Sequence, residues 1–166
     1  MPSDLEQLRR DLEDAIAGAS DNALSQAPEG KWNSAQILEH LFLTYKNTNY
    51  GLKKCLEKGV PLATSATLKH RVATLLVVDL GYLPKGREAP QRAMPRGMSP
   101  AEVRTAIFAE IEKMVSGFAD CERCLGIGTK IMDHPFLGPL TAGEWRKFHF
   151  VHGQHHTKQI RERIRK

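Results

Sequence analysis

The chain has 166 residues with 41% hydrophobic and 26% charged side chains, a balance typical of one globular domain that buries its own core, here residues 1–166. Three cysteines are too few for a disulfide framework, which indicates a cytoplasmic protein. An apolar run at residues 72–80, broken by Asp79, is too short to span a bilayer, so no membrane partner is expected. The polar start of the chain predicts no signal peptide. The net charge of +5 does not favour a nucleic-acid partner, because the basic residues are dispersed except at residues 161–166.

The first predicted helix begins at a capping box formed by Ser3 and Glu6 and ends near Gly18. Residues 20–32 contain proline and glycine and are predicted to be a connection. The helix carries one apolar stripe at helical spacing, which consists of Leu5, Leu8, Leu12 and Ile16.

A second helix is predicted from Asn33 or Ser34 to about Lys58, because a capping residue precedes apolar positions at helical spacing and a glycine follows. His40 lies in its first turns, next to apolar positions. A third helix is predicted at residues 65–80, and a long polar loop follows at 81–98. The third helix is predicted to carry Leu68, Val72, Leu75, Leu76 and Asp79 on one side.

A fourth helix is predicted to begin after Ser99, with proline at its first position. Residues 119–140 are predicted to be irregular, and no strand is expected, because no useful length of the chain alternates between polar and apolar residues. Cys121 and Cys124 are interpreted as small apolar side chains at a helix end, since a zinc knuckle needs a second ligand pair. His134 is interpreted as a loop anchor, although its side chain could approach a metal.

The last helix, which begins at a capping box at residues 141–144, carries four of the seven histidines. His152 and His156 are one turn apart and can point two imidazoles at one metal ion. His149 shares much of that face and is a candidate base or proton shuttle; a solvent-facing or capped histidine is the alternative. His155 is turned partly away, toward the rim or the solvent.

Two histidines on one helix make a weak metal site, so a third ligand is required, and His40 in a bundle core can supply it. Three neutral imidazoles suit Zn²⁺ or a similar divalent ion and leave a coordination position open. A zincin is excluded because Gly153 stands where that motif has its glutamate base. Gln159 is a candidate to hydrogen-bond a ligand or a residue behind the metal; a plain surface glutamine is the alternative.

Residues 32–41 and 152–160 together resemble motifs of the DinB-like superfamily of metal-binding four-helix-bundle proteins, and residues 134–145 resemble one uncharacterised branch of it. The resemblance implies an all-α, up-down-down-up four-helix bundle with an additional helix and long loops, often a homodimer. It also implies a metal triad of His40, His152 and His156 that holds zinc or nickel.

Characterised relatives transfer low-molecular-weight thiols or isomerise substrates with the help of a thiol. The resemblance therefore implies activation of a thiol or water for transfer to, or hydrolysis of, a small electrophile. Whether the chain is an enzyme stays open. One alternative is a non-catalytic, stress-related or structural dimer stabilised by its metal, and a weaker one is a basic nucleic-acid binder.

Overall fold

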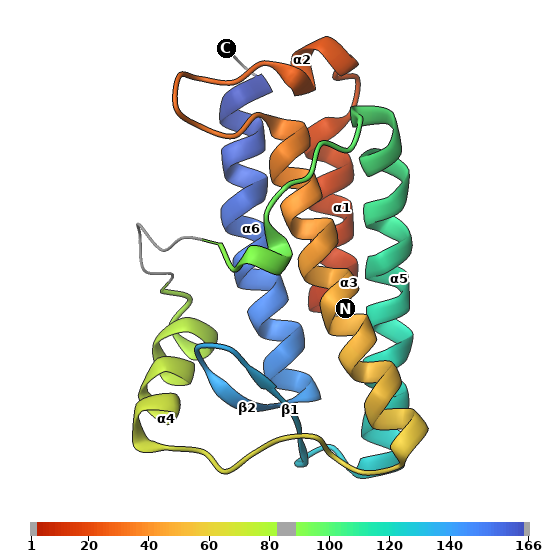
Figure 1. Ribbon diagram of the computed structural model, residues 1–166, viewed down its shortest axis with the longest axis vertical. Helices are drawn as coiled ribbons and strands as arrows, with labels where there is room; N and C mark the ends of the chain where they lie inside the picture. Colours follow the sequence, from red (N-terminus) through yellow and green to blue (C-terminus); the bar gives the residue numbers. More distant parts are fainter. Residues whose placement is uncertain (1–2, 83–88, 165–166) are drawn as a thin grey trace.

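Four long helices run side by side in the computed structural model, which describes residues 3–82 and 89–164 (Figure 1). They are α1 (Asp4–Ile16), α3 (Ser34–Lys58), α5 (Pro100–Leu125) and α6 (Ala142–Ile164). Helices α1 and α6 run in one direction and α3 and α5 in the other, so the predicted up-down-down-up order is confirmed. The predicted connection at residues 20–32 contains a further short helix, α2 (Asp21–Ser25).

The long helices begin at capping boxes; those of α1 and α6 are predicted as such, and of the two caps left open for α3, Asn33 is the one observed. In each box the capping side chain accepts a hydrogen bond from the amide three residues later, and that residue's side chain accepts one from the capping residue's amide. Helix α3 ends at Gly59, whose φ of 64° lies in the left-handed region that glycine adopts without strain. The capping residues are Ser3, Asn33, Ser99 and Thr141.

The apolar stripes of the long helices meet in one core, where Leu8 of α1 and Phe118 of α5 are fully buried. Helices α1 and α6 approach closely where Gly153 faces Leu8. A Cβ atom added at Gly153 would lie 2.4 Å from Leu8 Cδ1 and 2.7 Å from Leu8 Cδ2. Any larger residue at this position would therefore require the buried Leu8 side chain to shift.

The prediction of an irregular segment without strands at residues 119–140 is wrong. Helix α5 continues to Leu125, and β1 (Lys130–His134) pairs antiparallel with β2 (Gly138–Thr141). The hairpin is held by tertiary contacts: Trp145 Nε1 donates to the Met132 carbonyl at 3.2 Å, and Cys55 Sγ donates to the Ile131 carbonyl at 3.3 Å. These strands are stabilised by packing on the bundle, and their residues do not alternate between polar and apolar. The sequence therefore contains no sign of them.

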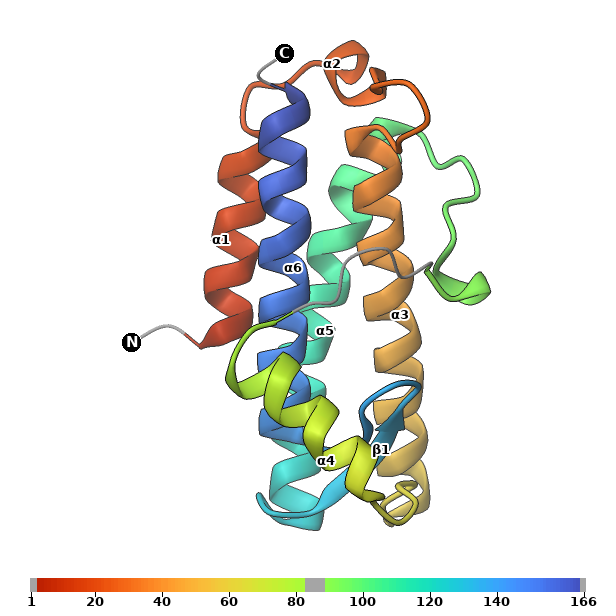
Figure 2. The same ribbon diagram turned by 90° about the vertical axis from the view of Figure 1, so that its left-hand side faces the viewer.

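The third predicted helix begins later and is less regular than expected. It consists of α4 (Leu68–Thr74) and a π-helical turn, η1 (Leu75–Asp79). Figure 2 shows α4 lying outside the long helices, across α6 and next to the hairpin. The predicted loop at 81–98 includes a 3-10 turn, η2 (Gln91–Ala93), and its residues 83–88 lie outside the described residues. Residues 165–166 of the basic cluster at 161–166 lie outside them as well.

The cysteines form no disulfide with one another. Cys121 and Cys124 both lie near the end of α5, as predicted; Cys55 and Cys121 are buried, whereas Cys124 is exposed. Among the described helices, none combines the length and hydropathy that crossing a membrane would require.

Candidate metal centre

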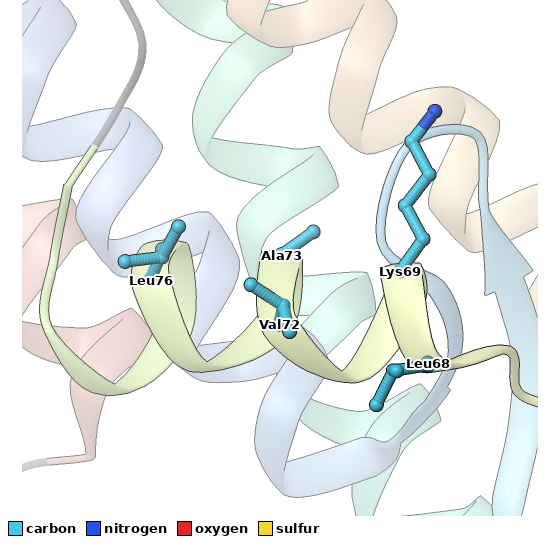
Figure 3. A pocket seen from close by; sticks show the side chains of 5 residues that line it. All are labelled: Leu68, Lys69, Val72, Ala73 and Leu76. Carbon is cyan, nitrogen blue, oxygen red and sulfur yellow. The ribbon is translucent and has the colours of Figure 1, made fainter.

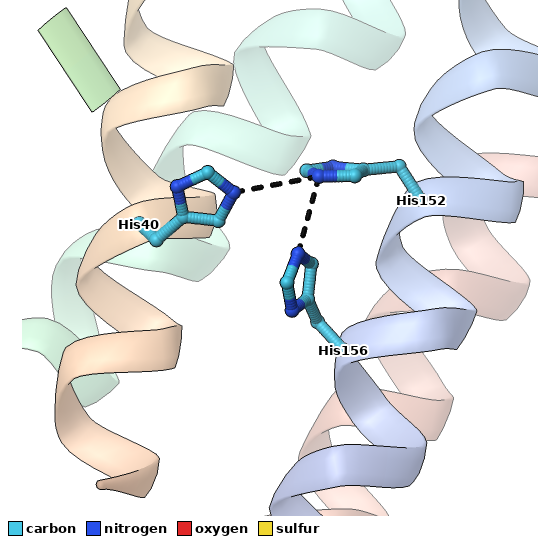
Figure 4. Close-up of side chains that lie close together, drawn as sticks. All are labelled: His40, His152 and His156. Atoms are coloured by element: carbon cyan, nitrogen blue, oxygen red, sulfur yellow. Dashed lines mark hydrogen bonds between the residues drawn. The ribbon is translucent and has the colours of Figure 1, made fainter. Parts of the chain in front are cut away.

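His40 on α3 and His152 and His156 on α6 point toward one another inside the bundle (Figure 4). The Nε2 atom of His152 lies 3.4 Å from Nε2 of His40 and 3.2 Å from Nε2 of His156. The ligand atoms of the group all lie within 4.8 Å of one another. The structure therefore brings together the three side chains that the sequence singles out as a triad.

The separations between these nitrogens suit a tetrahedral metal ion. With zinc–nitrogen bonds of about 2.0–2.1 Å, two ligands at a tetrahedral angle lie about 3.3–3.4 Å apart. The two Nε2–Nε2 distances, 3.2 and 3.4 Å, are close to that value. The donor set and its spacing thus fit a divalent cation of zinc's size.

Hydrogen bonds behind the triad fix which ring nitrogen faces the centre. His40 Nδ1 lies 2.9 Å from the Ala93 carbonyl, which can only accept, so Nδ1 donates and Nε2 keeps its lone pair. His156 Nδ1 lies 2.9 Å from Gln159 Oε1, while the amide nitrogen of Gln159 lies 3.1 Å from His155 Nε2. This network gives His156 the same tautomer as His40 and places Gln159 behind a triad residue.

The triad is uncharged at neutral pH. Burial is the main cause that lowers the pKa of each imidazole, and neighbouring histidines lower it further at His152 and His156, where the value for His156 falls to about 3. Lone pairs on Nε2 of His40 and His156 therefore face His152 Nε2, which can carry one proton and satisfy only one of them. His152 Nδ1 is buried without a hydrogen-bond partner among the described residues. A shared cation would satisfy all three inward nitrogens at once.

Aromatic side chains cover two members of the triad. The Phe148 ring stacks on His152 with a centroid distance of 5.5 Å and an interplanar angle of 11°, and the Trp32 ring lies 5.4 Å from the His40 ring. Within the described chain, the cluster contains three potential ligand residues and no fourth. Structural zinc sites generally have four protein ligands, so a three-histidine group is typical of a site with an open position.

The segment that follows Ala93 is held in place by Glu39, the residue next to His40 on α3. Glu39 is 1% exposed, and its carboxylate accepts hydrogen bonds from the amides of Arg96, Gly97 and Met98 at 2.7, 3.0 and 3.0 Å. Successive amides that point at one anion form a nest, for which the positive φ of Gly97, 98°, is suited. Glu39 thus fastens the segment that follows Ala93 to the helix that carries His40.

Sequence reasoning missed both Glu39 and Ala93. A signal existed for Glu39, because an acidic residue lies directly before His40 among the apolar residues Ile37, Leu38 and Leu41. No signal existed for Ala93, since it acts through its backbone carbonyl from a loop 53 residues away in sequence.

His149 lies in the core and outside the group of three histidines. It is 0% exposed, so the alternative of a solvent-facing histidine is wrong. Its Nε2 lies 3.0 Å from the Thr48 hydroxyl, its ring packs against Tyr45 and Trp145, and its Nδ1 has no partner among the described residues. Burial, followed by the nearby His134, lowers the pKa of His149 to about 3.

We expect His149 to make the metal-free protein sensitive to acid. Between its folded pKa of about 3 and its ordinary value of 6.5, the unfolded chain binds a proton that the folded chain excludes. Stability is therefore complete above about pH 6.5 and falls as the pH drops toward 3, by about 2 kcal/mol between pH 7 and pH 5. In urea unfolding with a chelator present, His149→Gln should reduce the loss between these pH values by about that amount.

His155→Gln provides the control, because it removes a histidine from the surface of the same helix rather than from the core. Equal pH dependence of the wild type and His149→Gln would show that His149 is not excluded from protonation in the folded protein.

The remaining candidates have structural contacts. His134 Nδ1 accepts from the amides of Phe136 and Leu137, both at 3.2 Å, which confirms its interpretation as a loop anchor. His155 is exposed, as predicted. Glu144 completes the cap of α6 and also pairs with Lys130 of β1 at 2.6 Å, so it serves the fold rather than the triad.

These observations define an all-α, four-helix-bundle protein with a histidine cluster in its core. The chain matches the family model of the DinB superfamily over residues 4–160. It belongs to this superfamily, and the resemblance of its two histidine motifs is thereby confirmed. No curated protein and no solved structure matches it.

Proposed function

We propose that the protein binds one divalent metal ion, zinc or nickel, through Nε2 of His40, His152 and His156. The observation that carries the proposal is the convergence of these nitrogens at 3.2 and 3.4 Å. Two of the three imidazoles are oriented by acceptors at Nδ1, as metal-binding histidines usually are. Because the pKa of each triad imidazole is lowered, the metal does not have to displace the proton of an imidazolium at neutral pH.

We propose further that the site activates a low-molecular-weight thiol or water. A bound divalent cation lowers the pKa of a thiol or water at its open position and so supplies a nucleophile at neutral pH. In the thiol reaction, sulfur forms a bond to an electrophilic carbon, the leaving group departs with its electron pair, and the thiol proton passes to solvent. Hydrolysis follows the same course with water in place of the thiol.

The chain's own residues position and shield this site. Ala93 and Gln159 keep the Nε2 atoms of His40 and His156 directed inward, and Phe148 and Trp32 restrict the water around the triad. We do not propose His149 as a base or proton shuttle, because it is fully buried and its Nε2 is hydrogen-bonded to Thr48.

Cobalt substitution followed by turnover measurements tests the proposed function. Protein purified without a histidine tag and loaded with Co²⁺ should show sulfur-to-cobalt charge-transfer absorption when cysteine or glutathione is added, because an open position admits the thiolate. The zinc and nickel forms should then consume thiol together with an activated aryl halide or an epoxide. A chelator should abolish this turnover, and added metal should restore it.

The non-catalytic alternative predicts a different result. A metal that only fixes the helices would raise the melting temperature, but neither thiols nor water would have access to it. Stoichiometric metal with no thiol-dependent absorption, and no turnover of thiol or of hydrolysable esters, would overturn the proposed activity and leave metal binding standing.

A further inference from the structure

Helix α4 and the turn after it present large apolar side chains to solvent. We call this surface the outer face; its side chains are between 41% and 79% exposed. Figure 3 shows three of them, Leu68, Val72 and Leu76, following one another along the helix. Monomeric proteins seldom expose such a continuous apolar stripe. The outer face consists of Leu68, Val72, Leu75, Leu76, Leu80 and Tyr82.

The opposite side of the same segment is anchored to the molecule. The Thr74 hydroxyl donates to the Leu137 carbonyl at 3.3 Å, and the His70 side chain lies against Gly138. Val77 and Val78 are 7% and 3% exposed. The helix cannot turn its outer face toward the bundle without losing these hydrogen-bond and apolar contacts.

The π turn extends the outer face. It is closed by the bond from the Leu80 amide to the Leu75 carbonyl at 3.0 Å, and a π turn holds close to one residue more than an α turn. Eight residues that include this turn therefore complete about two full turns. As a result Leu80 lies above Val72, and Asp79 lies on the edge that carries Arg71.

We propose that the outer face packs against the outer face of a second copy of this chain, with the two helices antiparallel about a twofold axis near Thr74. At the observed exposures each of the six side chains offers on the order of 100 Å², so together they supply about 600 Å² of the roughly 800 Å² that each partner contributes to a standard interface. The proposal thus assigns an interface to the homodimer that the resemblance implies. The proposal does not depend on the metal centre.

The order of residues along this segment is self-complementary. A twofold axis at the level of Thr74 places Leu68 opposite the partner's Leu80, and Val72 opposite the partner's Leu76, as an interface between identical surfaces requires. It also brings Arg71 near the partner's Asp79 on the same edge, and the reverse pair by symmetry. Both side chains are exposed, and neither forms an ion pair within the described chain.

Light scattering coupled to gel filtration tests the proposal. The wild type should be a dimer at about 100 µM, where a complex of micromolar Kd is largely formed, and Leu76→Glu should be a monomer with an unchanged helical spectrum. Ile127→Glu is the matched control, because Ile127 is 76% exposed in the turn that follows α5 and is not part of the outer face, so its replacement should leave the dimer intact.

Charge reversal tests the pairing across the axis. Arg71→Glu and Asp79→Arg should each weaken the dimer on the order of tenfold, since each places two like-charged pairs at the interface edges. The double variant reverses both charges and should restore the wild-type Kd. If the two residues acted independently, the double variant would not regain the wild-type Kd.

Disulfide trapping tests the direction of the helices, in a background with the exposed Cys124 replaced by serine. Leu75→Cys lies near the axis and should cross-link to its counterpart. Leu68→Cys should not, because antiparallel packing separates the two copies of residue 68 by about 20 Å. A monomeric wild type, a dimer indifferent to Leu76→Glu, or cross-linking at residue 68 in place of 75 would overturn the proposal.

Discussion

Replacing His156 by alanine should weaken metal binding by more than about 100-fold. Mutating a residue that only hydrogen-bonds to a metal ligand costs up to about 100-fold in affinity, and the loss of a ligand itself should cost more. The variant leaves His40 and His152, and two imidazoles form a weak site. The stabilisation that metal gives the folded protein, about 2.7 kcal/mol at a hundredfold excess over Kd, should disappear as well. Competition with a chromophoric chelator measures the affinity, and thermal unfolding with and without metal measures the stabilisation.

His155→Ala is the control for this experiment, because it removes the adjacent imidazole, which is exposed and contacts His156 and Gln159 but does not belong to the group of three ligands. It should keep affinity within a few-fold of the wild type. If His156→Ala bound metal as tightly as His155→Ala does, the ion would have to be held elsewhere, and the proposed triad would be abandoned.

Replacing Glu39 by glutamine should reduce both stability and metal affinity. The carboxylate accepts three amide hydrogen bonds, whereas an amide side chain has one oxygen and directs its own N–H groups at the remaining donors. Loss of one or two bonds to a charged acceptor costs about 2–3 kcal/mol of unfolding free energy. Because the same segment presents Ala93 to His40, metal affinity should fall about 10–100-fold.

A second buried acid distinguishes this effect from general destabilisation. Glu110 is 7% exposed and bonds Asn49 and Lys113, away from the triad, so Glu110→Gln should lower stability and leave metal affinity unchanged. Nitrogen chemical shifts of the imidazoles in metal-free protein provide another measurement, since His40 should lose its fixed Nδ1–H tautomer in Glu39→Gln only. An unaltered tautomer with unaltered affinity would contradict the role of Glu39.

The parts of the fold that sequence predicts are those encoded locally. Capping boxes fix where α1, α3, α5 and α6 begin, because the bonds that define them join residues three apart. The i, i+4 spacing of His152 and His156 likewise follows from helical geometry. The sequence also indicated that His40 would meet them, through the resemblance and through its place on the apolar side of α3.

The parts that sequence could not predict depend on contacts between distant segments. The hairpin at residues 130–141 has short strands, one containing Pro139, and is stabilised by Trp145 and Cys55 from two different helices. The burial of His149 depends on Thr48, 101 residues away. The apolar positions of α4 were visible as a stripe, but periodicity does not tell whether a stripe faces the core or the solvent.

The contact between Gly153 and Leu8 restricts how this centre can be remodelled. A glutamate introduced next to His152, as would be needed to imitate a metalloprotease helix, would direct its carboxylate into the neighbouring helix α1 and collide with a leucine that is fully buried. An acid–base group introduced from α3 or from the segment that contains Ala93 would avoid this collision with Leu8.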